Sequence, residues 1–440
     1  MIQALVKKAP WTFTLALTVT LAPIFAYGNP FSIARYNGLV GGPFDRSPFA
    51  LYWNPARLTK PGARLALHGA LITRQASYDR APTDPNASPE VLAANSGLNH
   101  TGATGVVPGG AFAYGGEGAG LRWGFGLGSY IARAGTTNWD RPRDYPAQFP
   151  GAVDGPQRWN ALNTSMLIVT HSAGIAIGTK SFAVGGALRY NQVSLSTTRA
   201  SNPSNPEALV DVQGRIAEGR LLLRDAEGDD LLWTLGVYGA LSDDLSLALS
   251  WRQGTSYTLE GEALLTIGTA DETRFRAEFP LQVADIVTFG ALWKVNDSLR
   301  LRPELEWGGW SVMDEQVAAN VDDPRRPELL RFERNFEDTW AVRLRSDFRL
   351  SEQFTLHGGL GFETGATPEE TFEPGLAESD HFTLGAGLSW RATDWVTLRS
   401  SFIWQQFRDM TVSESIQKPQ ARGDYQDQRQ YLTLDLEFTL

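Results

Sequence analysis

Apolar and polar residues alternate along most of this chain, and this alternation constrains its fold more than any other feature. The last ten residues show it best, because Leu432, Leu434, Leu436, Phe438 and Leu440 occupy every second position with mostly polar residues between them. A period of two is typical of β-strands that present one apolar and one polar face. The same pattern recurs in segments 299–307, 340–350, 354–363 and 396–405. From residue 63 onward the chain is therefore predicted to be all-β.

The connections between the predicted strands distinguish a membrane barrel from a soluble β-sandwich. Fourteen strands are expected, at about 63–79, 108–117, 120–135, 160–173, 181–199, 231–242, 244–263, 280–295, 298–313, 338–350, 353–366, 380–391, 394–409 and 429–440. Connections after the even-numbered strands are short, as in Leu241–Asp244, whereas those after the odd-numbered strands are long, as in 200–230. This alternation on an even number of strands is typical of outer-membrane barrels. A sandwich with crossover connections would not produce it, so we predict a transmembrane antiparallel β-barrel.

The composition agrees with a membrane protein that has no helical spans. Beyond residue 28 there is no run of about 18 apolar residues, so only a closed barrel could satisfy the backbone hydrogen bonds in lipid. The 14 Trp suit the two aromatic girdles of such a barrel. The absence of Cys excludes a disulfide scaffold and thiolate metal sites. The net charge of −10 gives no support to nucleic acid as a partner.

The first 28 residues are typical of a secretory signal. Two lysines precede an uncharged, mostly apolar stretch, and Ala26-Tyr27-Gly28 offers small residues for cleavage. Cleavage is expected before Asn29, or alternatively after Ala26, and the stretch is short for a membrane anchor. The predicted domains are a cleaved signal peptide (1–28), an N-terminal plug or hatch (29–62) that lacks the period of two, and a barrel (63–440). The expected location is the bacterial outer membrane.

A barrel of fourteen strands has a lumen too wide for its own side chains to fill, and residues 29–62 precede it like a plug. The stretches that resemble a known family are, in chain order, Asn37-Gly38-Leu39, Ala50-Leu51-Tyr52-Trp53-Asn54-Pro55-Ala56-Arg57-Leu58, Phe279-Pro280-Leu281, Leu305-Glu306-Trp307-Gly308-Gly309-Trp310-Ser311 and Phe336-Glu337-Asp338-Thr339-Trp340-Ala341-Val342-Arg343. The chain resembles the FadL/TodX family of outer-membrane transporters for long-chain fatty acids and aromatic hydrocarbons. It departs from the family at Arg57, where the plug motif usually continues with Gly, and at Leu440, where many barrels end in Phe.

The resemblance implies a passive transporter of hydrophobic small molecules, monomeric and surrounded by outer-membrane lipid and lipopolysaccharide. Family members capture the ligand in an external groove, pass it to a pocket beside the plug and release it through the wall near a kinked third strand. The candidate transport residues are Gly124, Gly126, Gly128, Tyr130, Leu221, Leu222, Leu223, Trp310, Arg343 and Arg345. The candidate plug residues are Asn37, Gly38, Asn54, Pro55 and Ala56.

Each group of transport residues also has a purely structural interpretation. The glycines either weaken the third strand, so that it kinks and opens, or make room for the plug. The two arginines either pair with a ligand carboxylate or join a lumenal ladder of ion pairs with Glu304, Glu306 and Asp347. The three leucines either line a capture groove or extend a hairpin above the membrane.

No enzyme, cofactor or metal site is expected. The five His have no metal-binding spacing, and no Gly-x-Ser-x-Gly motif occurs. Two other functions remain as alternatives to transport. One is a structural or receptor barrel whose plug stays closed, and the other is a porin for polar solutes, against which the plug argues.

Overall fold

The computed structural model describes residues 36–141, 154–202, 207–208, 210, 213–268 and 270–440. The predicted signal peptide and the first residues of the predicted plug, 29–35, therefore lie outside the described residues. Among the described residues, no helix is long and apolar enough to span a membrane.

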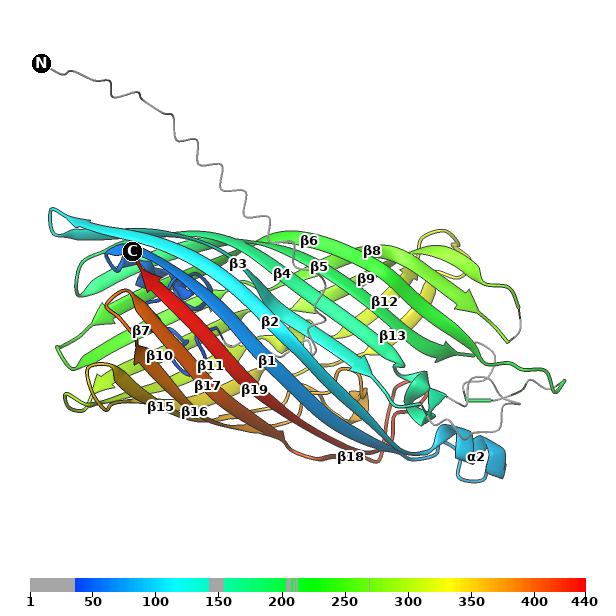
Figure 1. Cartoon of the computed structure of the whole chain (residues 1–440). Helices are drawn as coiled ribbons and strands as arrows, with labels where there is room; N and C mark the ends of the chain where they lie inside the picture. The colour runs from blue at the N-terminus through cyan, green and yellow to red at the C-terminus, as the bar shows by residue number, and fades with distance from the viewer. Residues whose placement is uncertain (1–35, 142–153, 203–206, 209, 211–212, 269) are drawn as a thin grey trace, which may run out of the picture.

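The strands form one antiparallel sheet that closes on itself (Figure 1). The closure is made by β1 (Gly62–Arg80), which pairs with β2 (Gly97–Gly118) on one side and with β19 (Gly423–Thr439) on the other. The uninterrupted strands between them are β3 (Leu121–Asn138), β4 (Asn163–Gly178), β5 (Phe182–Ser201), β6 (Gly219–Ala240), β15 (Phe354–Glu363) and β16 (His381–Arg391).

The remaining strands are each interrupted once, so that two consecutive segments together form one strand. These pairs of segments are β7 (Leu245–Arg252) with β8 (Thr255–Thr266), β9 (Thr273–Val283) with β10 (Ile286–Lys294), β11 (Leu299–Gly308) with β12 (Glu315–Asn320), β13 (Glu328–Glu333) with β14 (Thr339–Arg349), and β17 (Val396–Phe407) with β18 (Met410–Val412). Counted in this way, the 19 segments of the described residues make fourteen strands, as predicted.

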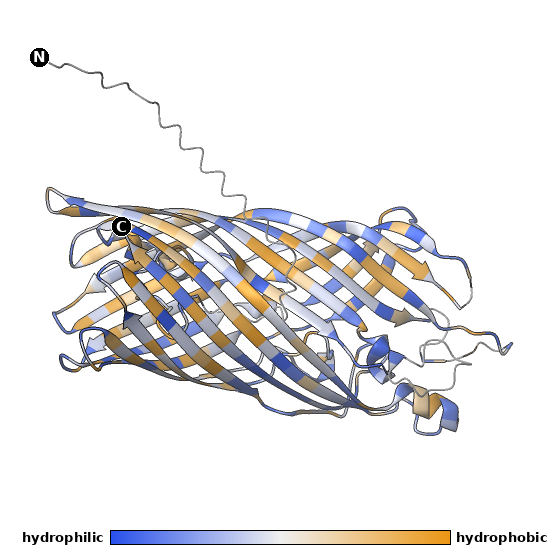
Figure 2. Ribbon diagram, in the orientation of Figure 1, coloured by the Kyte–Doolittle hydropathy of each residue, from blue (hydrophilic) through white to orange (hydrophobic). Residues whose placement is uncertain are grey.

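The two faces of the wall differ as the alternation requires. On β19, Leu432 and Leu434 point outward and are 52% and 53% exposed, whereas Thr433 and Asp435 between them are buried inside the barrel. Figure 2 shows the same alternation of hydrophobic and hydrophilic residues on neighbouring strands. An apolar outer face is what a barrel in a lipid bilayer needs.

Several strands are longer at one end than predicted. β2 begins at Gly97 rather than at residue 108, and β6 begins at Gly219 rather than at residue 231. The added residues form hairpins at the end of the barrel that carries the long loops, on the right in Figure 1. Both faces of a strand can be polar where it has left the bilayer. The alternation of hydropathy therefore fades there, although the hydrogen-bond ladder continues.

Short helices cap this external end of the barrel or belong to the plug. The external ones are α2 (Pro89–Asn95), η3 (Pro156–Trp159), η4 (Trp310–Val312) and η5 (Glu369–Thr371). The plug contains α1 (Ala50–Trp53) and η1 (Pro55–Thr59), and all but one of the residues from Ala50 to Thr59 are buried.

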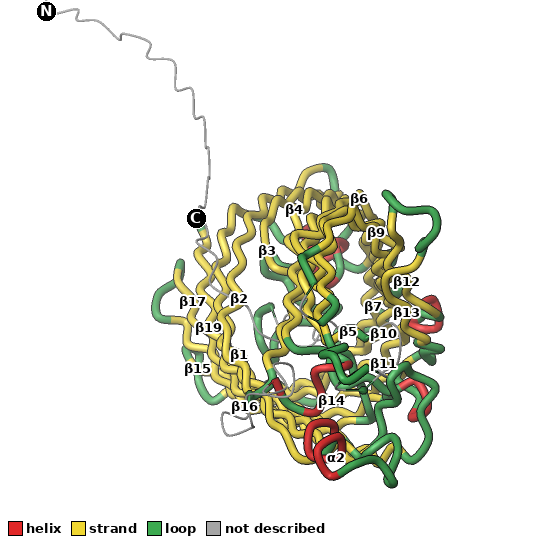
Figure 3. Tube along the Cα trace, turned by 90° about the vertical axis from the view of Figure 1, so that its right-hand side faces the viewer, coloured by secondary structure: helices red, strands yellow, loops and turns green. Residues whose placement is uncertain are grey.

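The segment before β1 lies inside the barrel. Its residues are held by strands from all around the wall, through hydrogen bonds to Asp435 on β19, Ser401 on β17, Arg302 on β11 and Val237 on β6. Seen along the barrel in Figure 3, the strands form a ring, and some helix and loop segments lie within its outline. The predicted lumenal plug is therefore present, at the end of the barrel that carries the short turns and the C-terminus.

Candidate functional site

A row of very small residues in the wall forms the seat of the plug. Gly115, Gly124, Ala176, Gly185 and Gly236 are successive cross-strand neighbours from β2 to β6. A Cβ on Gly124 would lie 2.7 Å from the carbonyl carbon of Leu58, and one on Gly236 would lie 2.8 Å from Cγ of Asn54. Larger side chains in this row would therefore collide with the plug. The row cannot be recognised in the sequence, because it appears only once the strand register is known.

The predicted plug residues make the turns and hydrogen bonds that hold the plug in this seat. Asn54 donates from Nδ2 to the carbonyl oxygens of Pro43 and Val237, both at 3.1 Å, and its Oδ1 accepts from the N–H of Ala56 at 3.1 Å. Pro55 occupies the first turn of η1, where its missing N–H costs nothing. The motif Asn54-Pro55-Ala56 therefore both caps η1 and attaches it to the wall.

The start of the plug is fixed by a second turn. Asn37 and Gly38 both have positive φ angles, of 63° and 52°. The backbone N–H of Asn37 donates to Asp435 at 3.0 Å, and its side chain donates to Asp45 at 3.0 Å. Asp435 also lies 2.6 Å from Nδ1 of His68 on β1. The plug is thus linked at this point to both strands that close the barrel.

Gly124, Gly126 and Gly128 face the plug, as predicted from the alternation on the third strand. A Cβ on Gly126 would lie 3.1 Å from the Leu51 side chain, and one on Gly128 would lie 3.3 Å from it. The intervening Trp123, Phe125 and Leu127 are exposed on the outer face. All three glycines are regularly paired with both neighbouring strands. Their position therefore favours the interpretation that they make room for the plug.

The irregular part of β3 begins just after these glycines. Its ladder with β2 ends at the pair Gly109–Tyr130 and resumes only at an isolated bridge between Thr101 and Trp139. On the other side, the register with β4 shifts between Ile131 and Arg133. Residues 130–135 are all buried, without the alternation seen before them. The third strand therefore bends into the lumen and leaves a break in the wall between β2 and β3.

Aromatic and cationic side chains surround the inner side of this break. Tyr36 of the plug donates its hydroxyl to the carbonyl of Ile131, and its ring lies 5.0 Å from that of Tyr130. The guanidinium of Arg133 lies 4.9 Å from the ring of Trp310. Two predicted transport residues, Tyr130 and Trp310, are thereby brought to the same bend, and both are buried.

The external hairpins enclose a cavity of about 690 Å³. Its apolar lining comes from several hairpins and a loop, and consists of Trp159, Leu221, Leu265, Ile267, Phe275, Leu329, Leu330 and Ile416. Of the three predicted leucines, Leu221 lines this cavity, Leu223 lies buried beside it and Leu222 points to the other face of β6. The run therefore extends a hairpin, and one of its leucines also lines the external cavity.

This external cavity is basic although the chain as a whole is acidic. Arg199, Arg326, Arg331 and Lys418 line it, against Glu328 and Glu333. Arg199 is 7% exposed, lies 5.4 Å from the Phe332 ring and donates to the carbonyl of Lys418 at 3.3 Å. Within the described residues, no carboxylate lies within 4.0 Å of the Arg199 guanidinium. No sequence pattern marks Arg199, because its neighbours in the cavity come from distant loops.

Apolar side chains connect the external cavity with the bend in β3. One cluster of buried residues includes Leu221 and Leu223 beside the cavity and Ile131, Ala132 and Ala134 in the bend. The same cluster continues into the plug through Tyr36, Phe49 and Leu51. One sector of the lumen is thus apolar, whereas charged residues fill the opposite sector.

The two predicted arginines belong to that charged sector. Arg343 pairs with Glu306 at 3.1 Å and with Glu363 at 2.8 Å, and Arg345 pairs with Glu304 at 3.2 Å. The next rung of this ladder is Arg302 with Asp347, at 2.8 Å. The arrangement corresponds to the ion-pair ladder rather than to a site with a guanidinium left for a ligand. Within the described residues, no group of three or more His, Cys, Asp or Glu side chains could hold a metal ion.

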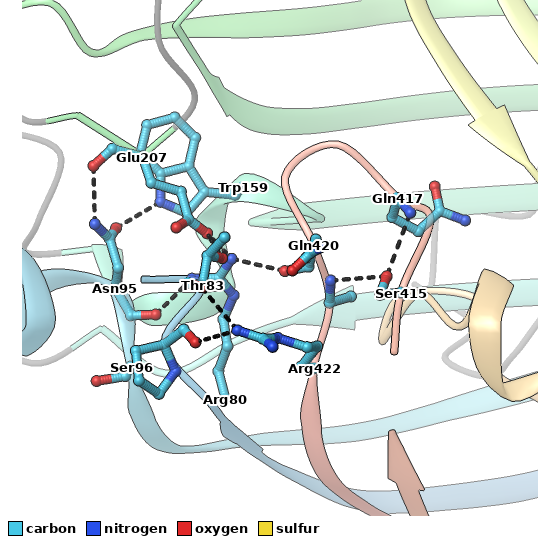
Figure 4. Close-up of polar contacts among 12 residues, drawn as sticks. Arg80, Thr83, Asn95, Ser96, Trp159, Glu207, Ser415, Gln417, Gln420 and Arg422 are labelled. Atoms are coloured by element: carbon cyan, nitrogen blue, oxygen red, sulfur yellow. Dashed lines mark hydrogen bonds and ion pairs between the residues drawn. The ribbon is translucent and has the colours of Figure 1, made fainter. Parts of the chain in front are cut away.

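A polar network closes the external end beside the cavity (Figure 4). Arg80 of β1 pairs with Glu207 and donates to the carbonyl of Gln420 at 2.8 Å. Asn95 at the end of α2 donates to the carbonyl of Glu207 at 2.9 Å and accepts from Nε1 of Trp159 at 2.7 Å. Trp159 also lines the cavity, so this network fixes part of its wall.

The solved structures with a similar fold include outer-membrane transport proteins. The chain superposes on a FadL homologue of Pseudomonas aeruginosa with a TM-score of 0.75 at 14% identity, covering 94% of this chain and 99% of that one. The toluene transporter TbuX of Ralstonia pickettii gives 0.63 at 16% identity, covering 94% and 98%, and the toluene transporter TodX of Pseudomonas putida gives 0.65 at 14%, covering 95% and 99%. No curated protein sequence matches the chain. A family model described as outer membrane protein transport protein (OMPP1/FadL/TodX) matches residues 41–439, and the chain therefore belongs to this family of outer-membrane transporters of hydrophobic compounds.

Proposed function

We propose that this chain carries hydrophobic acids, such as long-chain fatty acids, passively across the outer membrane and releases them sideways through the break between β2 and β3. The observation that carries the proposal is the break itself, which lies next to the apolar sector of the lumen. The route needs a single chain, so we propose that the protein acts as a monomer in outer-membrane lipid and lipopolysaccharide. Export by a cleaved signal peptide, residues 1–28, is part of the same proposal.

The external cavity supports the assignment of the ligand as an acid. Its apolar lining suits a hydrocarbon chain, and Arg199 offers a buried guanidinium with no carboxylate of the described residues within 4.0 Å, although Glu373 attracts it from farther away. Guanidinium groups bind carboxylates through two parallel hydrogen bonds, and burial strengthens such pairs. A neutral arene such as toluene would leave Arg199 and Lys418 without a role.

The free-energy cost of unpaired backbone groups at the break in the wall is an argument for a lateral exit. Backbone groups that face the hydrocarbon region without partners cost several kcal/mol each. A purely structural barrel gains nothing from such a break, and a porin for polar solutes would not be filled by a plug. A transporter of hydrophobic molecules uses both features, because the plug blocks the polar route while the break opens to lipid.

A bulky side chain in the bend tests the exit. Ala134→Trp should fill the space between β2 and β3 and stop uptake of labelled oleate by whole cells, with normal amounts of folded barrel in the membrane. The matched control is Gly69→Trp on β1, where an added Cβ meets no atom within 4 Å. Uptake that persists in a correctly assembled Ala134→Trp variant contradicts lateral release at this position.

Substitution of the cavity cations tests the ligand class. Arg199→Gln and Lys418→Gln should lower oleate uptake by about tenfold, equivalent to one lost charge-assisted interaction, and leave toluene uptake unchanged. The control is Arg276→Gln, since Arg276 is exposed and paired with Asp322 outside the cavity. Equal losses for oleate and toluene would point to a damaged cavity rather than to recognition of a carboxylate. Deletion of the gene without any change in uptake of either compound would favour the closed receptor barrel.

A further inference from the structure

A second cavity, of about 360 Å³, lies under the plug at the end of the barrel that carries the short turns. That end faces the periplasm in outer-membrane barrels. Seven cationic side chains line the cavity, against four acidic ones. The cations are Arg46, Arg57, Lys60, Lys294, Arg300, Arg302 and Arg399, and the acids are Asp45, Asp243, Asp347 and Glu437. The charge is thus opposite in sign to the net charge of −10 of the chain.

Four of the seven cations already have a carboxylate partner. Lys60 and Arg399 share Glu437, at 3.5 and 2.8 Å, and Arg302 pairs with Asp347 at 2.8 Å. Lys294 pairs with Asp297 at 3.0 Å. Arg46, Arg57 and Arg300 remain, and no carboxylate of the described residues lies within 4.0 Å of their guanidinium groups.

The acids of the cavity attract these arginines only from beyond ion-pair distance, as Glu437 attracts Arg46 and Asp45 attracts Arg57. Asp45 accepts hydrogen bonds from the side chains of Asn37 and Ser47, at 3.0 and 3.1 Å. Asp243 stands in an exposed turn at the rim. Residues 1–35 contain neither Asp nor Glu. This N-terminal segment therefore has no side-chain carboxylate that could pair with the three arginines.

Arg57 is held in place as a binding group would be. Its guanidinium lies 3.6 Å from the centre of the Tyr238 ring, and the Tyr238 hydroxyl is 3.1 Å from Oγ of Ser246. Burial, and then the neighbouring charge of Arg46, lower the pKa of Arg57 to about 10. The residue is still protonated at neutral pH, and a bound anion would reverse both effects. Arg57 is also the residue at which the plug motif of this chain departs from the plug motif of the FadL/TodX family.

We infer that Arg46, Arg57 and Arg300 form a binding site for a phosphate group at the periplasmic face of the plug, either as a soluble phosphate or as a phospholipid headgroup. Three guanidinium groups around one cavity match the charge and the several acceptor oxygens of a phosphate dianion, which accepts paired hydrogen bonds from arginine. The cavity shares no lining residue with the external cavity or with the bend in β3. It is therefore independent of the proposed transport route.

Calorimetric titration of the full-length protein in neutral detergent tests the site. At low ionic strength, where screening is weak, inorganic phosphate should bind with a stoichiometry of one. Arg57→Gln and Arg300→Gln should each weaken binding by about tenfold or more, as expected for the loss of a charge-assisted interaction. The matched control is Arg122→Gln, because Arg122 lies at the same end of the barrel but pairs with Glu117 outside the cavity. The shift in gel mobility between folded and heat-denatured barrel verifies that every variant is folded.

A second titration, with dihexanoyl phosphatidic acid, separates the two sources of phosphate. Binding at least ten times tighter than that of inorganic phosphate, and dependent on Arg57, assigns the site to a lipid headgroup. Similar affinities for both probes assign it to a soluble phosphate. The inference is wrong if neither probe binds the folded wild-type protein, if Arg57→Gln binds both as the wild type does, or if Arg122→Gln weakens binding equally.

Discussion

The glycines of the wall predict a graded response to the addition of a single methyl group, according to how closely each one faces the plug. Gly69 points to open space, Gly126 would place a Cβ 3.1 Å from the Leu51 and Leu58 side chains, and Gly124 would place one 2.7 Å from the Leu58 carbonyl carbon. Ordinary contacts begin near 3.4 Å. Gly126→Ala therefore needs a shift of a few tenths of an ångström in flexible side chains. Gly124→Ala must displace the plug backbone by more than about 0.7 Å, because the carbonyl oxygen of Leu58 lies even nearer to the added Cβ than its carbon.

These displacements translate into free energies of plug docking. Overpacking a well-filled interior costs about 1–3 kcal/mol, and we expect Gly124→Ala to fall in this range. Such a change increases the population of an undocked plug about 5- to 150-fold. Gly126→Ala should cost under about 1 kcal/mol, because side chains adapt more easily than backbone, and Gly69→Ala should have no measurable effect.

Two measurements follow the plug in the assembled barrel. Amide hydrogen exchange of residues 50–59 reports local opening, and conductance in planar bilayers reports the leak of ions past the plug. Both should rise in the order Gly69→Ala, Gly126→Ala, Gly124→Ala. Identical exchange and conductance for Gly124→Ala and Gly69→Ala would refute the argument that steric fit to the glycine row holds the plug.

Three further predictions concern single polar groups. Asn54→Ala removes three hydrogen bonds at 3.1 Å and should destabilise plug docking by about 1–3 kcal/mol, seen as ion leak, whereas an unchanged closed conductance would contradict this role. Arg158→Met leaves the buried Glu218 with only Arg220 and should cost about 3 kcal/mol, measured as earlier cleavage of the external loops by protease in urea; cleavage at the wild-type urea concentration would count against it. Burial, with Glu363 and Asp427 nearby, raises the pKa of Glu378 to about 7 from 4.5, so the folded state binds this proton more tightly and stability falls as the pH rises from about 4.5 to about 7. The melting temperature of Glu378→Gln should accordingly match that of the wild type at about pH 4 and exceed it at about pH 8, and parallel curves would rule out this titration.

The architecture could be predicted because a bilayer allows few ways to pair all the backbone hydrogen-bonding groups of a chain. Strict alternation around Leu432–Leu436 fixed which face is outward, and the lengths of the connections fixed the barrel and the number of strands. The strand ends could not be found in the same way. At Gly97 and Gly219 the hydropathy signal has ended, because neither face of the strand touches hydrocarbon any longer.

The site was predictable only where it is local in sequence. Asn54-Pro55-Ala56 forms its own cap, and the alternation on the third strand correctly directed Gly124 inward. The break beside Ile131 is an absence of pairing, for which the residues of β3 give no signal of their own. What distinguishes Arg199 and Arg57 is that no carboxylate of the described residues lies within 4.0 Å of either guanidinium. That property belongs to the folded arrangement and to no segment of the chain.

The long external hairpins have a consequence for where a ligand first meets the protein. β2 and β6 each have 22 residues, which at about 3.3 Å per residue and a tilt of about 40° rise roughly 55 Å along the barrel axis. The apolar band of such barrels is about 25 Å tall, so about half of the height of these strands lies outside this band, and the external hairpins reach into the sugars of the outer surface. The hydrated saccharide layer repels oily molecules, and the hairpins hold the apolar lining of the external cavity within this layer.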